Sequence, residues 1–351
     1  MKFSVLVPVY NTSQYLEQCL TSLVDQTFDD FEVIIVNDGS TDNSKDICDK
    51  YQSEYPEKIT VINQENQGLI AARRNAIKVA KGEYCIFVDS DDYIQLTLLE
   101  KVNDSINEYN TDVLIYSFRY VRDGVESESF KQIAEEGKIW TNEDKYELYE
   151  KMLTSNDVTS IWTKAVKTKV LKKDQTDYTL FKHKNMAEDF LQTMAIFTYA
   201  DTIGYKYIPE YMYRINNNSV SRSFRPQTIY SKNTIHVYDK AKEYLEIWGL
   251  NDKEHNEKLN ARWFNESMYM FSTYMENAKN KEAKFKVINA DWNSLIPDEV
   301  KILRNEYENK VYQELYDYLK EKNYKMLFRY FRKKKIISKI KRLKSKVKNA
   351  K

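Results

Sequence analysis

The chain has few of the residues that build disulfide frameworks or glycine-rich loops. Its 351 residues include only three cysteines, five prolines and seven glycines. Cys19, Cys48 and Cys85 fall in predicted helices and a predicted strand, at no metal-ligand spacing. We therefore expect buried thiols in a reducing compartment rather than disulfides or a cysteine-held metal.

Long apolar segments are missing as well. No stretch approaches the roughly 20 residues that span a bilayer, and no signal segment precedes the first predicted strand, which begins at Phe3. No fixed-period repeat or low-complexity linker is visible. The hydrophobic content of 42% is ample for a core, so we expect a cytoplasmic protein with two domains, or one domain and a substantial extension.

The first 95 residues alternate between short apolar runs and segments with helical spacing. The apolar runs, which we expect to be strands, are Phe3–Val9, Phe31–Val36, Ile59–Ile62 and Tyr84–Val88. The segments with helical spacing cover residues 16–23, 43–55 and 69–81. This alternation predicts βαβ units, hence an α/β fold with a parallel sheet covered on both faces.

Polar turns follow three of these predicted strands. They are Val9-Tyr10-Asn11, Asn37-Asp38-Gly39 and Asp89-Ser90-Asp91. Because ligands bind beyond the carboxyl ends of parallel strands, the turns should converge on one crevice. Buried carboxylates are usually paired or metal-bound, and Mn²⁺ or Mg²⁺ takes such oxygens together with substrate phosphates. The sequence thus predicts a metal and phosphate site, although aspartates also simply close turns.

Four motifs, in this order and spacing, resemble the signature of family 2 glycosyltransferases with the GT-A fold. They are Val7–Asn11, Val36–Asp42, Asn66–Arg73 and Phe87–Asp92. The resemblance is close from Met1 to about Tyr120 and continues as short islands. It implies a GT-A type, Rossmann-like, mostly parallel sheet with helices on both faces.

The resemblance also implies roles for individual residues. Those implied for nucleotide-sugar binding are Pro8, Tyr10, Asp38, Arg73, Asp89 and Ser90. Asp91 is implied to hold the Mn²⁺ or Mg²⁺ that bridges the diphosphate. Two alternatives stay open: Asp38 could be a turn residue beside Gly39, and Arg73 a surface cation.

A glycosyltransferase needs a base for the acceptor hydroxyl. Met186–Phe190 is similar to the family's Glu-Asp motif at a helix start, which implies Asp189 as the base and Glu188 as its support. A capping role for Asp189 competes, because the helix dipole favours acids there. The acceptor-side candidates are Trp162, Lys164, Glu188 and Arg214. Trp162 could instead be core.

The composition changes beyond Arg225. Residues 1–225 are predicted to form the GT-A domain, with a nucleotide-sugar half (1–120) and an acceptor-side half (121–225). Residues 226–328 are predicted to be helical, with helices over 237–250, 259–275 and 300–319. This region could shape the acceptor site or mediate homo-oligomerisation.

Residues 329–351 carry a strongly basic segment. Of the 54 Lys and Arg, 12 lie here without any acid, and 42 lie elsewhere beside all 53 Asp and Glu. Ile336, Ile340, Leu343 and Val347 recur at helical offsets. The pattern predicts a basic amphipathic helix on an anionic membrane surface. A solvated tail is the alternative, and no nucleic-acid motif supports nucleic acid as the partner.

Together these features predict an inverting, metal-dependent glycosyltransferase at the inner face of the cell membrane. It would transfer a sugar from a UDP-sugar to a saccharide, polyol or lipid-linked acceptor in cell-envelope or exopolysaccharide synthesis. A nucleotidyltransferase would need a glycine-rich basic loop, which the Tyr10–Ser13 turn lacks. A nucleotide-sugar-binding or membrane-adaptor module without catalysis is the other alternative. Intact Asp91 and Asp189 argue against it.

Overall fold

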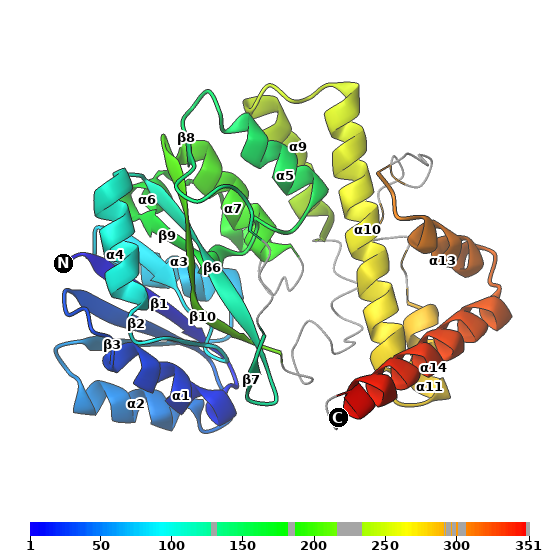
Figure 1. The fold of residues 1–351 in the computed structure, drawn as a ribbon, viewed down its shortest axis with the longest axis horizontal. Helices are drawn as coiled ribbons and strands as arrows, with labels where there is room; N and C mark the ends of the chain where they lie inside the picture. Colours follow the sequence, from blue (N-terminus) through cyan, green and yellow to red (C-terminus); the bar gives the residue numbers. More distant parts are fainter. Residues whose placement is uncertain are drawn as a thin grey trace. The chain divides into compact units, whose positions relative to one another are not determined.

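The computed structural model describes residues 1–127, 132–181, 187–215, 234–290 and 307–348, together with residues 292, 296 and 300. The chain forms two compact units, and Figure 1 shows its helices and strands coloured along the sequence. Unit 1 consists of Met1–Asn216 and Asp239–Gly249, and unit 2 of Asn217–Tyr238 and Leu250–Lys351. The predicted boundary at Arg225 falls outside the described residues.

The described part of unit 1 is built on one ten-stranded sheet. Its strands are β1 (Phe3–Val9), β2 (Phe31–Asp38), β3 (Ile59–Gln64), β4 (Tyr84–Phe87), β5 (Tyr93–Ile94), β6 (Val113–Arg122), β7 (Val125–Glu126), β8 (Ile139–Trp140), β9 (Lys164–Lys167) and β10 (Ile203–Arg214). Their order is β3-β2-β1-β4-β9-β6-β10-β5, with β7 beside β6 and β8 beside β10.

The sheet is parallel in its first part and mixed in its second. Strands β3, β2, β1 and β4 all run parallel, and Phe3 is in register with Phe31 on one side and Tyr84 on the other. Strand β9 then runs antiparallel between β4 and β6, while β5 and β8 run antiparallel to β10. The predicted α/β fold class is confirmed, and the parallel arrangement holds from β3 to β4.

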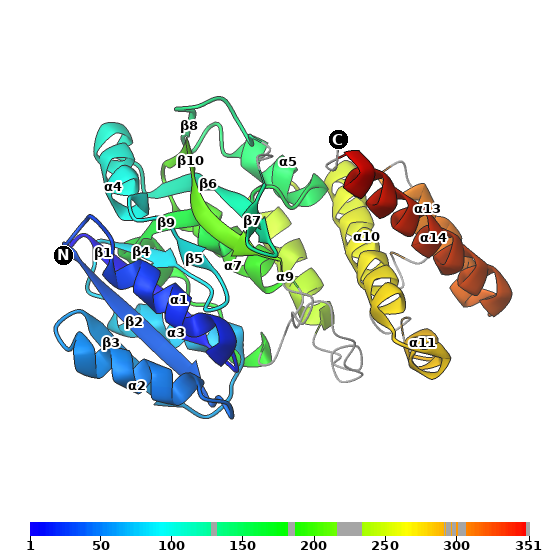
Figure 2. The same ribbon diagram turned by 60° about the horizontal axis from the view of Figure 1, so that its bottom comes forward.

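Helices flank this sheet. They are α1 (Ser13–Val24), α2 (Ser44–Glu54), α3 (Leu69–Val79), α4 (Leu98–Tyr109), α5 (Tyr146–Thr154), α6 (Thr168–Lys173) and α7 (Glu188–Tyr199), with 3₁₀ turns η1 (Ile161–Thr163) and η2 (Tyr178–Phe181). Figures 1 and 2 show α1 beside α2, and α3 packs on β1 and β2. Helix α3 ends before Gly82, where a Cβ would come within 2.4 Å of the Ser4 nitrogen. Only glycine allows this close approach.

Residues Asp239–Gly249 belong to unit 1, although the sequence places them in the C-terminal helical region. They contain most of α9 (Thr234–Ile247) and the turn that follows it. The Trp248 ring stacks on Tyr149 at 4.0 Å between centroids, and its indole N–H donates to the Thr198 hydroxyl at 2.8 Å. The half-buried Trp248 ring, stacked and with its N–H satisfied, accounts for the packing of this segment with unit 1.

Unit 2 is helical in its described residues. Its helices are α10 (Lys253–Asn277), α11 (Lys281–Ile288), α13 (Lys310–Lys320) and α14 (Tyr324–Lys348). Helix α10 packs on the other three. Of the predicted helix over 300–319, the described part includes α13 from Lys310, and Asn309 caps α13 by accepting from the Val311 N–H at 2.9 Å. Residues 301–306 lie outside the described residues.

The predicted start of the tail at Arg329 lies inside α14. This helix begins at Tyr324, and Phe331 is buried against Phe271 with 6.2 Å between ring centroids. Ile336 and Ile337 are the exposed apolar side chains of its next turn. The side chains after Ile337 lie outside the described residues.

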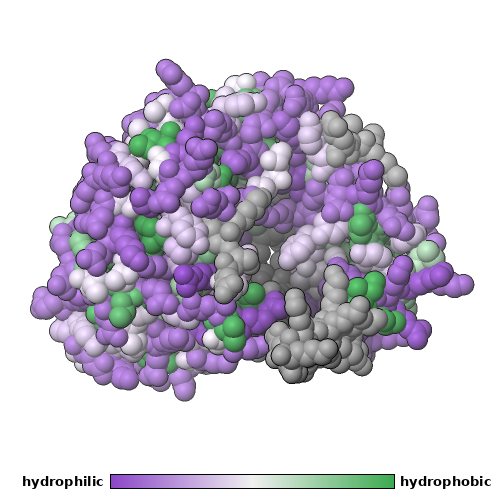
Figure 3. Space-filling view, viewed as in Figure 1, coloured by the Kyte–Doolittle hydropathy of each residue, from purple (hydrophilic) through white to green (hydrophobic). Residues whose placement is uncertain are grey.

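The described surface is largely polar. The face in Figure 3 is mostly hydrophilic, with small scattered apolar areas among the described residues. In the described parts of the chain, no helix combines the length and apolar character that crossing a membrane requires.

Candidate active site

The loops after β1, β2 and β4 converge, as the sequence predicts. The Asn11 side-chain oxygen accepts from the Thr41 N–H at 2.7 Å, which joins the first two loops. The Thr12 hydroxyl donates to the Ser90 hydroxyl at 2.9 Å, which joins the first and third. Three segments far apart in sequence therefore form one rim at the carboxyl ends of the strands.

Asp38 fixes the loop that enters α3. This carboxylate is only 3% exposed. It accepts from the Gln64 side-chain amide at 2.7 Å and from the Gln67 and Gly68 N–H groups, each at 2.8 Å. The adjacent Gly39 has a positive φ of 69°. Asp38 thus has a structural role at the site edge, and its nucleoside contact stays a prediction.

The other residues expected at the donor differ in exposure. Pro8 is buried within β1, whereas Tyr10, which follows the strand, is 41% exposed. Ser90 is 5% exposed, and Thr12 binds its hydroxyl. Of these three, Tyr10 offers the most accessible surface to a nucleoside.

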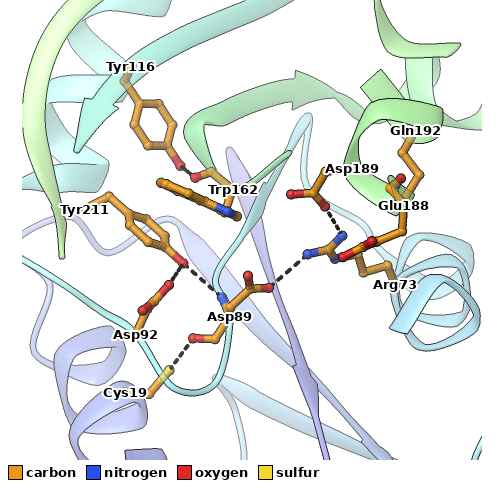
Figure 4. Close-up of polar contacts among 10 residues, drawn as sticks. All are labelled: Cys19, Arg73, Asp89, Asp92, Tyr116, Trp162, Glu188, Asp189, Gln192 and Tyr211. Carbon is orange, nitrogen blue, oxygen red and sulfur yellow. Dashed lines mark hydrogen bonds and ion pairs between the residues drawn. The ribbon is translucent and has the colours of Figure 1, made fainter. Parts of the chain in front are cut away.

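Arg73 joins two carboxylates at the centre of the site. It lies on α3 with its side chain only 1% exposed. One terminal guanidinium nitrogen donates to Asp89 at 2.9 Å and the other to Asp189 at 2.6 Å (Figure 4). Asp89 follows β4, and Asp189 lies in the first turn of α7. The alternative that Arg73 is a surface cation is wrong.

Asp189 is engaged by this ion pair rather than by a helix cap. The described start of α7 has no side-chain cap hydrogen bond at Ala187. The Asp189 side chain is 23% exposed, so part of the carboxylate faces solvent. A half-buried carboxylate held by one oxygen leaves its other oxygen for a proton.

Burial and neighbouring charges shift the pKa values of Arg73, Asp89 and Glu188. Burial acts to lower the pKa of Arg73, but Asp189 and Asp89 raise it by more, so the guanidinium stays charged. Burial raises the pKa of Asp89, although Arg73 opposes this. Burial, and then the charge of Asp189, raise the pKa of Glu188 to about 7.

Asp92 and Tyr211 fix the loop after β4, and neither is among the predicted site residues. Asp92 is 1% exposed and accepts from the Tyr211 hydroxyl at 2.9 Å and the Arg214 N–H at 2.7 Å. Tyr211 also accepts from the Asp89 N–H at 3.1 Å. Only the position of Asp92 directly after Asp91 signals it in the sequence, because its partners lie about 120 residues away.

Asp91 offers a carboxylate suited to a divalent metal. Burial raises its pKa to about 6, and the charge of Asp89 adds to this effect. Such a buried acid is stabilised by a cation, and Mg²⁺ or Mn²⁺ commonly binds one or two carboxylates plus substrate phosphates. The residues therefore fit a metal held jointly with a diphosphate. Within the described residues, no group of three or more His, Cys, Asp or Glu could hold a metal ion.

Arg214 borders the same loop. Its Nε donates to the Asp91 carbonyl at 2.8 Å and a terminal nitrogen donates to the Gln18 side chain at 2.7 Å. The guanidinium also lies 4.9 Å from the Tyr15 ring centroid and 5.4 Å from that of Tyr93. These contacts orient a partly exposed cation beside the Asp91 backbone.

Two of the predicted acceptor-side residues are buried. Trp162 is 6% exposed and stacks on Tyr211 and Tyr213 at 4.7 and 5.1 Å between centroids. It therefore packs as a core residue, which is the alternative to an acceptor contact. Lys164 is 0% exposed, and its ammonium donates to the Ser160 carbonyl at 2.5 Å. The expected contact of Lys164 with an acceptor does not fit this structure.

Comparisons with known proteins agree with this geometry. Residues 4–173 match the family model Glycosyl transferase family 2. These residues form a family 2 glycosyltransferase domain. The resemblance inferred from the four motifs is confirmed, and the chain has the GT-A type of α/β fold.

Two curated relatives and one solved structure illustrate the similarity. Glycosyltransferase GlyA of Streptococcus pneumoniae serotype 4 is 35% identical over 231 residues, which are 63% of this chain and 32% of that protein. Poly(ribitol-phosphate) beta-N-acetylglucosaminyltransferase TarS of Staphylococcus aureus strain Mu50 is 34% identical over 206 residues, or 58% of this chain and 34% of that protein. The chain therefore spans about a third of the length of both relatives.

The solved structure is that of S. aureus TarS residues 1–349 in complex with UDP-GlcNAc. It matches with a TM-score of 0.60 and 27% identity, covering 86% of this chain and 83% of that one.

Buried Lys164 should make stability depend on pH. Burial lowers its pKa to about 7, whereas a lysine in an unfolded chain stays protonated to about pH 10. Between these values only the unfolded chain binds the proton. The free energy of unfolding should therefore fall by a few kcal/mol, to order of magnitude, as pH falls from about 10 to about 7.

Urea unfolding of the wild type and Lys164→Met at several pH values measures this effect. The difference between the two proteins should change across this window in favour of the variant at lower pH. A constant difference would show that Lys164 is not buried in its neutral form.

Proposed function

We propose that the chain is an inverting, metal-dependent glycosyltransferase. It transfers a sugar from a UDP-sugar to a hydroxyl of a saccharide or polyol acceptor in cell-envelope or exopolysaccharide synthesis. One observation carries the proposal: Arg73, which lies within the family 2 glycosyltransferase domain of residues 4–173, binds both Asp89 after β4 and Asp189 on α7. The complex of TarS with UDP-GlcNAc supports the donor class, and the poly(ribitol-phosphate) acceptor in that relative's name supports the acceptor class.

In the proposed reaction the acceptor oxygen attacks the anomeric carbon while the bond from that carbon to the diphosphate oxygen breaks. Asp189 takes the acceptor proton, and Glu188 supports it from the same helix turn. Tyr10 and Asp38 border the nucleoside, and Asp89 and Ser90 the ribose side. A metal held by Asp91 would offset the charge that develops on the leaving diphosphate.

A panel of sugar nucleotides tests the function directly. The full chain is incubated with each UDP-sugar and a polyol or saccharide acceptor, with Mn²⁺ or Mg²⁺, and products are identified by mass. Acceptor-dependent sugar transfer is the expected result. Donor binding without any transfer or hydrolysis would instead indicate a binding module.

Asp91→Ala should abolish metal-stimulated UDP binding and leave the fold intact. Loss of one hard ligand is costly where the protein supplies few of them. Calorimetry with UDP and Mn²⁺ measures the effect. Asp29→Ala, at a side chain that is 96% exposed, is the matched control. Unchanged metal-dependent binding in the Asp91 variant would remove Asp91 from the metal site.

Asp189→Asn should lower turnover by about 10² or more with little change in donor affinity. The amide keeps the oxygen that accepts from Arg73 but cannot take the acceptor proton. Steady-state kinetics and donor calorimetry separate the two effects. Turnover that persists in this variant would place the base elsewhere.

We further propose that the chain binds the inner face of the cell membrane through the end of α14, close to a lipid-linked acceptor. Ile336 and Ile337 are exposed at the start of this segment. Seven of the 12 bases of the tail lie after them, between residues 339 and 351. Each base near an anionic bilayer contributes on the order of 1 kcal/mol. Homo-oligomerisation through the helical region stays a prediction.

Truncation after Lys335 tests this membrane proposal, because it keeps buried Phe331 in place. The truncated protein should no longer float with anionic liposomes, and the full chain should float less at high salt. Sugar transfer to a soluble acceptor should be unchanged. Equal flotation of both proteins, or equal binding to neutral liposomes, would contradict the electrostatic anchor.

A further inference from the structure

We propose that Arg73 is a positioning residue for the base. It holds Asp189 against the donor-side carboxylate Asp89, without contacting the nucleotide. The inference rests on the proposed function, in which Asp189 takes the acceptor proton. It replaces the nucleotide contact that the family resemblance implies for Arg73.

The hydrogen bonds of the guanidinium support this role. Both terminal nitrogens are occupied, one by Asp89 at 2.9 Å and one by Asp189 at 2.6 Å. The remaining nitrogen, Nε, is buried and has no partner among the described residues. The Arg73 side chain is 1% exposed, whereas each carboxylate is 23% exposed. A diphosphate could reach Arg73 only by displacing these ion pairs.

The ion pairs extend a hydrogen-bonded chain from the loop after β4 to α7. Asp92 accepts from Tyr211, Tyr211 accepts from the Asp89 N–H, and the Asp89 carboxylate accepts from Arg73 (Figure 4). Arg73 then reaches Asp189. Every link is buried or half-buried, so the position of the base depends on the loop that meets the donor. Such preorganisation keeps reacting groups in attack geometry.

The charges around Asp189 make Arg73 decisive for its position. Glu188 on the same helix and Asp89 after β4 are like charges that repel the Asp189 carboxylate. Lys164 on β9 is the other nearby cation, but burial lowers its pKa to about 7. Arg73 alone forms a described ion pair with Asp189. Without it, the carboxyl would face two acids and one weakly charged lysine.

Arg73→Gln tests the inference through the separation of kcat from donor affinity. Without the guanidinium, Asp189 is no longer held beside Asp89, so kcat should fall by about tenfold or more. The Kd for the donor, measured by calorimetry, should stay within about threefold.

Two further variants serve as controls. Arg74→Gln removes a cation from the adjacent position, but Arg74 binds the Asp174 carboxylate at 3.3 Å and the Leu171 carbonyl at 3.2 Å, so kcat should not change. Arg73→Lys keeps a cation that can reach only one carboxylate well. Its kcat should fall by less than that of Arg73→Gln, which also decides the question should the glutamine variant fail to fold.

Two results would overturn the inference. A donor Kd weakened as much as kcat falls would show that Arg73 contacts the nucleotide. A loss of kcat that is equal in Arg73→Gln and Arg73→Lys would show a merely structural role. If the wild type transfers sugar and Asp189→Asn is inactive, either result would leave the proposed function standing. Absence of transfer by the wild type would overturn both.

Discussion

Unit 1 holds several buried or half-buried carboxylates at one edge of its sheet. Their contacts with a guanidinium and with hydrogen-bond donors determine how the site is arranged. Asp89 and Asp92 are held by Arg73 from α3 and by Tyr211 from β10. Asp189 reaches the same guanidinium from α7. Buried acids without partners would cost several kcal/mol each. The ion pairs therefore tie the first half of the domain to the second, and they place the proposed base beside the donor aspartates.

The sequence alone predicts the parts of this arrangement that depend on local pattern. Apolar runs followed by polar turns identify β1, β2 and β4 and the convergence of their loops, because side-chain period and turn chemistry are local. The antiparallel insertion of β9 leaves no such signal. Neither do the partners of Arg73, since Asp189 lies 116 residues away. Lys164 and Trp162 show the same limit: residue type suggested an exposed acceptor surface, and tertiary packing buries both.

The C-terminal half shows a similar division. Helices are predicted correctly where the apolar spacing is regular, but the spacing does not tell which core a helix joins. Residues Asp239–Gly249 return to unit 1 because Trp248 stacks on Tyr149, a pairing across about 100 residues. The basic segment is clear from charge counting, yet its boundary is set by Phe331, which is buried against Phe271.

The stereochemistry of the product tests the central claim most directly. A base at Asp189 acting opposite the leaving diphosphate requires a single displacement, which inverts the anomeric carbon. The measurement is the anomeric proton coupling in the NMR spectrum of the product that the full chain makes from an α-linked donor such as UDP-GlcNAc. The account predicts a β-linked product. An α-linked product would contradict it, because retention requires a different arrangement of nucleophile and base.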